Sequence, residues 1–393
     1  MAQRMRIIVH GYLVRGPLGG IAWHHLQYVL GLRRLGHDVY FIEDSDDYPS
    51  CYDPVRNVTD TDPGYGLRFA AAAFSRLGLG ARWAYYDAHR RVWHGPARRP
   101  AELCASGDIL LNLSGVTPLR SWVERIPARV FVDTDPVFTQ VRHLKEPAAR
   151  GRAAAHNVFF SFGENIGHPD CTIPVDGFPW QPTRQPVVLD AWKPTPGDGR
   201  HPLTSVMQWG SYAPAEHNGT FYGMKAESFG PYLDLPQKCG ERFALAIGSR
   251  AEPRRHLERH GWSVTDPREA TRDPWTYQAF IASSKAEFGI AKHGYVISRS
   301  GWFSERSASY LASGRPVVVQ ETGFSRWLEA PGGVLPFTTP EEALAQLDAL
   351  NHGYAFRCRA ARATAEEYFE SGTVLAQLLA AAMNAAPEAL SRR

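Results

Sequence analysis

Cysteine is scarce in this chain, and the few cysteines are scattered. The sequence has five in 393 residues, an odd number with no C-x-x-C pair: Cys51, Cys104, Cys171, Cys239 and Cys358. Cysteine-based zinc sites need closely spaced pairs, so this spacing argues against one. It also argues against a disulfide framework and favours a reducing compartment, so we expect a cytoplasmic protein.

Long apolar runs are missing as well. No stretch approaches the ~20 apolar residues that a membrane-spanning helix needs. The apolar run Ile7-Ile8-Val9 near the start is too short for the core of a signal peptide. We therefore expect no transmembrane segment and no export of the chain.

An excess of charge of either sign is also absent. The 43 basic residues nearly balance the 40 acidic ones, which leaves a net charge of +3. This balance predicts neither a nucleic-acid partner nor an anionic membrane. With 44% hydrophobic and 21% charged residues, the composition is typical of a globular protein. A chain of 393 residues exceeds one ordinary domain, so we expect two.

The first half of the chain alternates strand-like and helix-like patterns. Short apolar strands are predicted at 6–9, 39–42, 108–112, 129–133 and 158–162, with a helix from Ile21 to Leu35 between the first two. Such alternation predicts a parallel, doubly wound sheet. We assign residues 1–190 to an N-terminal Rossmann-like domain.

The alternation stops at 191–203, a segment rich in proline and glycine that we predict to be a linker. It restarts afterwards, and we assign residues 204–370 to a second Rossmann-like domain and 371–393 to a C-terminal helix and tail. Sheets of this type bind ligands outside the carboxyl ends of their strands. We therefore expect the two domains to face each other across a cleft that holds the active site.

Polar residues follow the predicted strands of the first half and indicate a binding rim. They include Asn112, Asp133, Asp135 and Glu164. Asp133 and Asp135 form a D-x-D pattern that could bind a divalent metal. Alternatively, they could be acceptor-side groups or a partner for a histidine base. We prefer the interpretation without a metal. Asp135 before a proline is also an ordinary turn opener.

Two adjacent histidines, His24 and His25, lie in the first turns of the helix after a glycine-rich loop. A helix N-terminus disfavours the imidazolium, so a histidine there stays neutral and can accept a proton. The alternative is that one of them packs and the other is solvated. The loop contains Gly19 and Gly20 but lacks G-x-G-x-x-G, which weakens a dinucleotide interpretation with Glu43 as ribose ligand.

The segment 301–323 combines a capped helix with a cluster of polar residues. Ser304 is a suitable N-cap, Glu305 suits the first turn, and Gly314 ends the helix. Hydroxyl and basic residues gather at the helix start: Lys285, Lys292, His293, Arg299, Ser300, Ser304 and Arg306. A free helix N-terminus with such neighbours suits a diphosphate.

The sequence A-S-G-R-P-V-V-V at 312–319, followed by Q-E-T-G at 320–323, resembles the donor-binding segment of GT-B-fold glycosyltransferases. The motif covers about forty residues, and the two-domain layout extends the resemblance to the whole chain as architecture. The resemblance implies that the C-terminal domain binds a nucleotide-diphosphate sugar. It also implies that the N-terminal domain binds a small-molecule or glycan acceptor.

The resemblance implies the donor roles at 304–307 and 320–322, and the polar residues described above supply the other candidates. Donor-binding residues would be Lys292, Arg299, Ser304, Arg306 and Ser307 at the diphosphate, Glu305 at the ribose, and Gln320, Glu321 and Thr322 at the sugar. Acceptor-binding residues would be Gly19, Gly20, Asn112, Asp133 and Glu164. Catalytic residues would be His24, His25 and Asp135. We expect no metal and no cofactor beyond the donor itself, and a homodimer is compatible with this layout.

One departure from the family pattern bears on the mechanism. Retaining members of the glycogen-synthase-like group carry E-x7-E, and the two corresponding positions here are Gly301 and Ser309. The absence of this pair favours inversion, in which a base on the acceptor side activates the nucleophile.

Three other functions remain open at this point. A nucleotide-sugar epimerase on the same fold would use Glu305 or Glu321 for proton transfer. A non-catalytic protein would bind a sugar or nucleotide and release it unchanged. A nicotinamide oxidoreductase is the third alternative.

Overall fold

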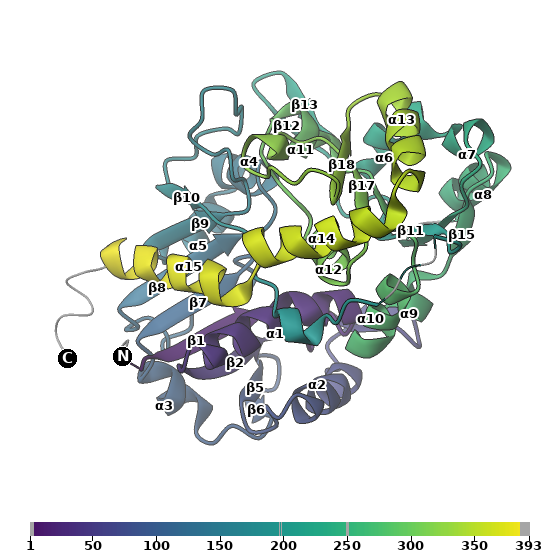
Figure 1. Ribbon diagram of the computed structural model, residues 1–393. Helices are drawn as coiled ribbons and strands as arrows, with labels where there is room; N and C mark the ends of the chain where they lie inside the picture. Colours follow the sequence, from purple (N-terminus) through teal and green to yellow (C-terminus); the bar gives the residue numbers. More distant parts are fainter. Residues whose placement is uncertain (1–3, 196, 198, 249–250, 386–393) are drawn as a thin grey trace.

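The computed structural model describes residues 4–195, 197, 199–248 and 251–385, and it contains two large, mainly parallel sheets (Figure 1). The N-terminal sheet has the order β10-β9-β8-β7-β1-β2-β5-β6 and the C-terminal sheet the order β15-β14-β11-β16-β17-β18. In both, the chain starts at a central strand, runs to one edge and then crosses to the other side. This is the Rossmann order. The predicted α/β fold with two Rossmann-like domains is confirmed.

The N-terminal sheet is parallel except for the pair β5–β6. Its strands are β1 (Arg6–Gly11), β2 (Asp38–Asp44), β5 (Trp83–Asp87), β6 (Val92–His94), β7 (Ile109–Leu113), β8 (Ala128–Asp133), β9 (Val158–Ser161) and β10 (Trp180–Pro182). The helices are α1 (Gly19–Arg34), α2 (Gly64–Arg76), α3 (Pro100–Ala105), α4 (Phe138–Lys145) and α5 (Pro147–Ala154). A separate hairpin is formed by β3 (Cys51–Asp53) and β4 (Val58–Asp60).

The C-terminal sheet is parallel throughout. Its strands are β11 (Leu203–Gln208), β14 (Phe243–Gly248), β15 (Ser263–Thr265), β16 (Glu287–Gly289), β17 (Val317–Gln320) and β18 (Val334–Phe337), and β12 (Ala215–His217) and β13 (Thr220–Tyr222) form a hairpin. The helices are α6 (Lys225–Phe229), α7 (Leu235–Lys238), α8 (Ala251–Arg259), α9 (Pro267–Ala270), α10 (Pro274–Ala282), α11 (His293–Ile297), α12 (Glu305–Ala312), α13 (Pro340–Asn351), α14 (Tyr354–Tyr368) and α15 (Ser371–Ala385). Short 3-10 turns occur at Leu189–Ala191, Gly230–Tyr232 and Phe324–Arg326. None of the described helices is both long and apolar enough to cross a bilayer.

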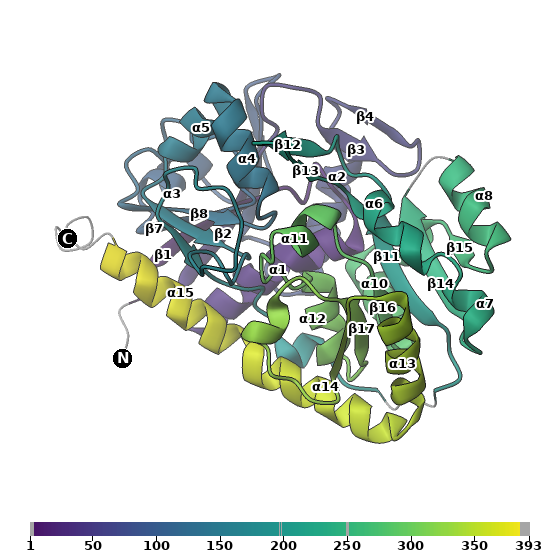
Figure 2. The ribbon, with the colours of Figure 1, turned by 90° about the horizontal axis from the view of Figure 1, so that it is seen from above.

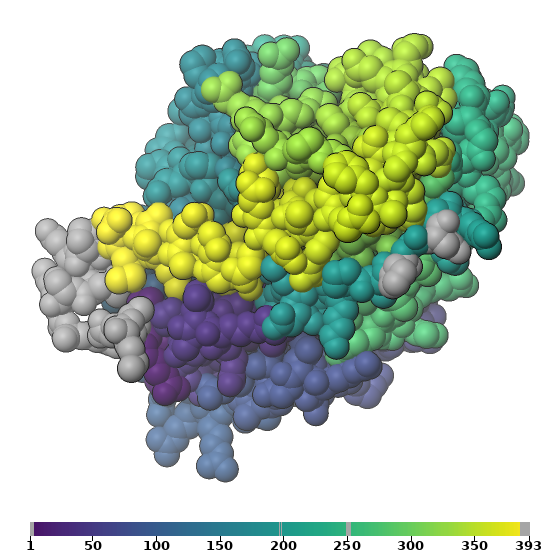
Figure 3. Space-filling model, in the orientation of Figure 1, coloured from purple at the N-terminus to yellow at the C-terminus, as the bar shows by residue number. Residues whose placement is uncertain are grey.

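The C-terminal helices return to the N-terminal half. Helix α14 packs on α12, and α15 packs on α1, so the yellow end of the chain lies against the purple segment (Figures 2 and 3). The Val187 N–H donates to the Phe369 carbonyl at 2.7 Å, and the Ser371 N–H donates to the Val187 carbonyl at 2.9 Å. The predicted tail therefore joins the two domains, as far as Ala385. Residues 386–393 lie outside the described part.

Two arginines, the buried Arg315 and the partly exposed Arg362, hold the segment that we predicted as a linker. The Arg315 guanidinium donates to the Thr195 carbonyl at 2.8 Å and to Thr195 Oγ1 at 2.7 Å. Arg362 donates to the Trp192 carbonyl at 2.7 Å. Positions 196 and 198 lie outside the described residues. The domain boundaries at 190 and 203 stay a prediction.

The start of α1 touches the other domain, and this contact yields a stability prediction. The Gly19 N–H donates to the Thr271 carbonyl at 2.6 Å. A Cβ on Gly19 would clash with the Asp273 carbonyl and lie 2.8 Å from Tyr277 Cβ, whereas a Cβ on Gly20 would meet nothing closer than 3.4 Å. We expect Gly19→Ala to lower the free energy of unfolding by about 1–3 kcal/mol because backbone must shift. Gly20→Ala is the matched control, and urea denaturation measures both. Equal effects would contradict this packing.

Candidate functional site

A cleft of about 820 Å³ separates the two sheets and is lined by both domains. The N-terminal domain contributes the loop before α1, the first turns of α1, the β3–β4 hairpin and the residues after β8. The C-terminal domain contributes the ends of β11 and β14 and residues of α6, α9, α10, α11 and α12. The polar side chains among its lining residues are Tyr12, His24, Tyr52, Asn57, Thr134, Asp135, Gln208, Ser211, Tyr212, Lys225, Arg254, Asp266, Arg268, Thr271, Tyr277, Lys292, Tyr295, Ser304, Glu305 and Arg306.

Positive charge is concentrated on the C-terminal wall of this cleft. Lys225, Lys292 and Arg306 all line it. Lys225 is only 9% exposed, and it has no ion pair or hydrogen bond with any described residue. Burial lowers its pKa well below 10.5, and the charges of Arg306 and Lys292 lower it further. The carboxylates of Glu287 and Glu305 oppose this shift only in part. A buried amine without an ion pair among the described residues, beside a second cation, suits an anion.

Arg306 is fixed at the floor of the cleft by a buried ion pair. Its Nε donates to Glu287 Oε1 at 2.5 Å, and its Nη1 donates to the Val206 carbonyl at 2.9 Å. Burial lowers the pKa of Arg306, but the Glu287 carboxylate outweighs this effect and the net shift is upward. The guanidinium therefore stays charged, and Glu287 and the Val206 carbonyl fix its position.

The start of α12 has the predicted geometry. Ser304 is the N-cap, and its Oγ accepts the Arg306 N–H at 3.2 Å. Ser304 and Ser307 also line a cavity of about 20 Å³ together with Gln320 and Thr322. Thus the helix start and the end of β17 meet at one place, as the sequence suggested. Glu305 projects into the main cleft.

His24 is the histidine that faces the cleft. It is 6% exposed, and neither ring nitrogen has a hydrogen-bond partner among the described residues. Burial lowers its pKa below 6.5, and the nearby Glu305 opposes this shift only in part. The imidazole is therefore neutral at pH 7 and can accept a proton.

His25 was predicted as a second candidate base, and the structure contradicts this. Its Nδ1 contacts the Ile21 carbonyl at 2.8 Å, and its Nε2 accepts the Tyr12 N–H at 3.2 Å. The ring is completely buried against Phe41, and burial lowers its pKa well below 6.5. Because both nitrogens are used by the backbone, His25 packs the core, as the alternative interpretation had it.

Asp133 and Asn112 are also structural and not acceptor-binding. Asp133 accepts from the side chains of Thr139, Gln140 and Ser161 at 2.6, 3.1 and 2.7 Å. It is 1% exposed, so neither a metal nor an acceptor reaches it. Asn112 is buried, and its Nδ2 contacts the Thr117 carbonyl at 2.8 Å and the His156 ring at 3.0 Å. Both side chains organise the sheet edge beneath the cleft.

Three more predicted residues line neither the cleft nor the small cavity. Glu321 accepts the N–H of Gly323 at 2.6 Å and a hydrogen bond from Ser325 Oγ, so it caps a turn. Arg299 has an exposed side chain and a left-handed φ of 47°. Glu164 is ion-paired with Arg184.

The two predicted loop glycines differ in their surroundings. Gly19 packs against α10. Gly20 does line the cleft.

Asp135 lies at the cleft but is not placed as a base. Its Oδ1 accepts from Lys292 Nζ at 2.8 Å and from the Tyr295 hydroxyl, and its Oδ2 accepts from the Tyr212 hydroxyl. Burial alone would raise its pKa, but Lys292 and the two hydroxyls lower it below the usual 3.8. A carboxylate with its oxygens occupied and a low pKa is a weak proton acceptor.

Sequence reasoning missed several residues of the cleft. Lys225 follows the β12–β13 hairpin, where no local periodicity marks it. Tyr212 and Tyr295 come to Asp135 only through the tertiary fold. Arg254 also lines the cleft. The available signal for Lys225 was a basic residue that comes soon after the first strand of the second domain.

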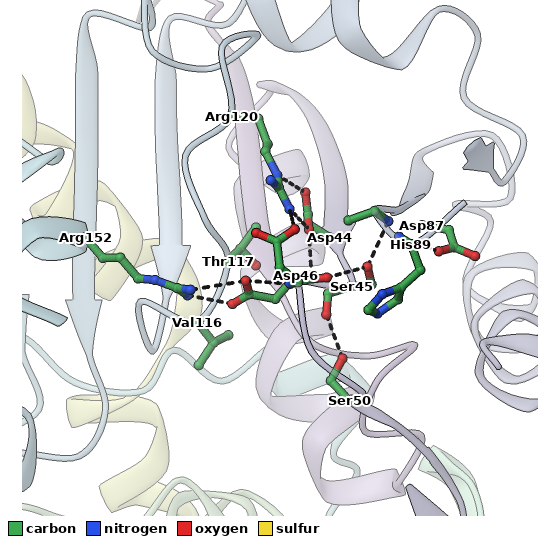
Figure 4. Close-up of polar contacts among 12 residues, drawn as sticks. Asp44, Ser45, Asp46, Ser50, Asp87, His89, Val116, Thr117, Arg120 and Arg152 are labelled. Atoms are coloured by element: carbon green, nitrogen blue, oxygen red, sulfur yellow. Dashed lines mark hydrogen bonds and ion pairs between the residues drawn. The ribbon is translucent and has the colours of Figure 1, made fainter. Parts of the chain in front are cut away.

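Two arginine–aspartate pairs anchor the loop that leads to the cleft hairpin (Figure 4). Arg120 donates to both oxygens of Asp44 at 3.0 and 3.2 Å, and Arg152 donates to both oxygens of Asp46 at 2.6 and 3.2 Å. Asp46 adopts a left-handed φ of 60°. The chain continues into the β3–β4 hairpin, whose Tyr52 lines the cleft. The two ion pairs therefore fix the loop that leads to the β3–β4 hairpin, and with it this wall of the cleft.

No group of three or more His, Cys, Asp or Glu side chains is arranged to hold a metal ion within the described residues. The D-x-D interpretation loses its support because Asp133 is enclosed and Asp135 is paired with Lys292. The charge available to a diphosphate in this cleft comes from lysine, arginine and helix N–H groups.

Comparisons with known proteins identify the fold. No protein-family model and no curated protein matches the sequence. An alpha-glucosyltransferase in complex with UDP and a 13-mer DNA containing an HMU base has a TM-score of 0.57 at 10% identity, over 97% of this chain and 100% of that one. AviGT4, a glycosyltransferase involved in Avilamycin A biosynthesis, has a TM-score of 0.52 at 13% identity, over 99% of each chain.

Alr3699/HepE of Anabaena, in complex with UDP-glucose, has a TM-score of 0.56 at 10% identity, over 96% of this chain and 99% of that one. At such identities the similarity concerns the fold. Together with the two Rossmann-order sheets, it shows that the chain has the two-domain GT-B fold of glycosyltransferases.

Proposed function

We propose that this protein transfers a glycosyl group from a nucleotide-diphosphate sugar to a hydroxyl of a small-molecule or glycan acceptor. The observation that carries the proposal is the buried Lys225, which has no ion pair within the described part of the chain, beside Arg306 and the start of α12. This combination suits the two phosphates of a donor. Two of the structural neighbours contain UDP or UDP-glucose, which makes uridine donors the first to test.

Each step of the proposed reaction has a group in the cleft. The acceptor oxygen attacks the anomeric carbon while His24 takes the hydroxyl proton. The bond between the anomeric carbon and the phosphate oxygen breaks, and its electron pair leaves with the diphosphate. Lys225, Arg306 and the α12 N–H groups stabilise that developing charge without a metal. Ser304, Ser307, Gln320 and Thr322 remain our candidates for donor contacts, with Glu305 at the ribose.

Several finer points belong to the proposal. A base on the acceptor side favours inversion at the anomeric carbon. We propose an acceptor other than nucleic acid because the chain's net charge is only +3. The DNA in the alpha-glucosyltransferase complex is a partner of that protein. A cytoplasmic location also remains a proposal.

The experiment that tests the proposal is a turnover screen with UDP-, GDP-, ADP- and TDP-sugars, in which NMR follows the products. We expect nucleotide-diphosphate release from one donor class. His24→Ala should lower kcat about 10²- to 10⁴-fold, since general-base catalysis contributes that much. Substrate epimerised without release of the diphosphate would favour an epimerase instead.

The pH profile provides the second readout of the same variant. The folded pKa of His24 lies below 6.5, so kcat/KM of the wild type should stay flat down to about pH 6.5 and fall only as pH drops through the lowered pKa. His24→Ala should lose this acid limb. His25→Ala serves as the comparison because its ring faces the core. An acid limb that survives in His24→Ala would exclude His24 as the base.

A further inference from the structure

The ammonium of Lys292 sits in an aromatic cage built by both domains. Its Nζ lies 4.9 Å from the ring centre of Phe138, 4.5 Å from that of Tyr212 and 5.3 Å from that of Tyr295. Asp135 closes the cage with a contact of 2.8 Å to the same nitrogen. Cation–π contacts gain strength when the cation is desolvated, and the Lys292 side chain is only 12% exposed.

The cage crosses the domain boundary. Asp135 and Phe138 follow β8 of the N-terminal domain, while Lys292 and Tyr295 belong to α11 and its cap in the C-terminal domain. The three side chains that donate to Asp135 all come from the C-terminal domain. Every strong contact of this carboxylate therefore ties one domain to the other.

Hydrogen bonds within the N-terminal domain fix the turn that presents Asp135. Asp133 accepts the Asp135 N–H at 2.9 Å, in addition to three side-chain donors. Val137 has φ 70° and ψ −49°, a conformation that costs energy for a β-branched residue. Its N–H donates to Gln140 Oε1 at 2.7 Å. These hydrogen bonds hold the strained backbone of the turn in one conformation.

Apolar packing surrounds the cage with residues of both domains. The cluster contains Val137, Phe138, Val141 and Ile173 on one side and Tyr222, Met224, Ala291 and Tyr295 on the other. The Phe138 ring leaves no room for a side chain at position 294, where a Cβ on Gly294 would lie 2.7 Å from it. The two domains are thus fitted closely at this point.

We propose that Lys292 and its cage form an interdomain latch that holds the cleft closed. Asp135 is then a positioning residue and not a catalytic one. The latch sets the distance between the cations of the C-terminal wall and His24 on the N-terminal wall. The role of the latch in setting this distance rests on the proposed function, whereas the closure itself does not.

Small-angle X-ray scattering of the ligand-free protein tests the latch without any substrate. Lys292→Met keeps the aliphatic stem and removes the charge, and Asp135→Asn keeps the shape and removes the anion. We expect a larger radius of gyration for both. Lys292→Arg should restore the wild-type value because a guanidinium also pairs with carboxylates and aromatic rings. Lys145→Met, at an exposed lysine of α4, is the matched control.

Donor binding provides the second readout. If an open form must close before it binds, the donor affinity of Lys292→Met and Asp135→Asn should fall about 5- to 150-fold, the usual range of such coupling. Tm measurements establish that both variants are folded. An unchanged radius of gyration in both folded variants would overturn the latch. Open variants of a protein that binds no nucleotide sugar would instead leave the latch standing and refute the proposed function.

Discussion

Replacing Arg306 by methionine should lower the free energy of unfolding by about 3–5 kcal/mol. The reason is that Glu287, the ion-pair partner of Arg306, stays buried when the guanidinium is removed. Glu287 is 0% exposed, and its Oε2 has no hydrogen-bond partner among the described residues. Without Arg306, the carboxylate loses the ion pair at 2.5 Å and stays buried. Urea denaturation followed by circular dichroism measures the loss.

The matched control for this prediction is the double variant Arg306→Met with Glu287→Gln. A neutral amide has a far smaller desolvation cost than an unpaired carboxylate. We therefore expect the double variant to regain a large part of the lost stability while it remains inactive. A double variant as unstable as Arg306→Met would mean that packing, and not the ion pair, stabilises this position.

Lys225→Met should stabilise the protein and impair catalysis at the same time. Turnover should fall about 10²- to 10³-fold because one charged group that stabilises the leaving diphosphate is lost. Stability should rise because the ammonium is buried and has no ion pair or hydrogen bond with any residue that the structure describes. A group that anchors the substrate at the expense of the fold is expected only at a functional site.

The sign of the pH dependence follows from the lowered pKa of Lys225. Between the lowered folded pKa and 10.5, the unfolded chain binds the proton more tightly, so wild-type stability rises with pH in this window. The Tm advantage of Lys225→Met should therefore be largest at low pH and shrink as pH approaches 10.5. Lys145→Met is the control. A variant less stable than the wild type at every pH would contradict the unpaired, buried ammonium.

Local sequence patterns were sufficient for the elements on which the donor site is built. Ser304 caps α12 and Gly314 ends it with a φ of 69°, as the capping signals predict. The apolar run Val317–Val319 is a buried strand. These features depend on neighbours in the sequence, so the sequence reveals them. They also explain why Ser304 and Arg306 reach the cleft.

Side-chain direction explains the errors at the catalytic positions. Successive residues of a helix differ by about 100° in direction, so His24 and His25 point different ways, and the spacing alone does not say which of them faces the cleft. His24 faces it, and His25 points at Gly11 and Phe41. The outcome depends on how α1 lies on β1.

Contacts between distant residues account for the rest. Asp135 looked like a catalytic group because polar residues gather at strand ends, but Lys292, its partner, is 157 positions away. Lys225 stands out only once the fold brings it beside Arg306. No periodicity encodes such distances, because they depend on how two separately patterned domains meet.

Calorimetric titration of UDP, GDP, ADP and TDP into the wild type and into Lys225→Met tests the central claim most directly. The claim is that the cations of the cleft bind the diphosphate of a donor. We predict saturable binding of at least one nucleotide diphosphate to the wild type, weaker at higher salt, and a loss of about tenfold or more in Lys225→Met. Failure of all four nucleotides to bind, or equal affinity for the wild type and Lys225→Met, would contradict it.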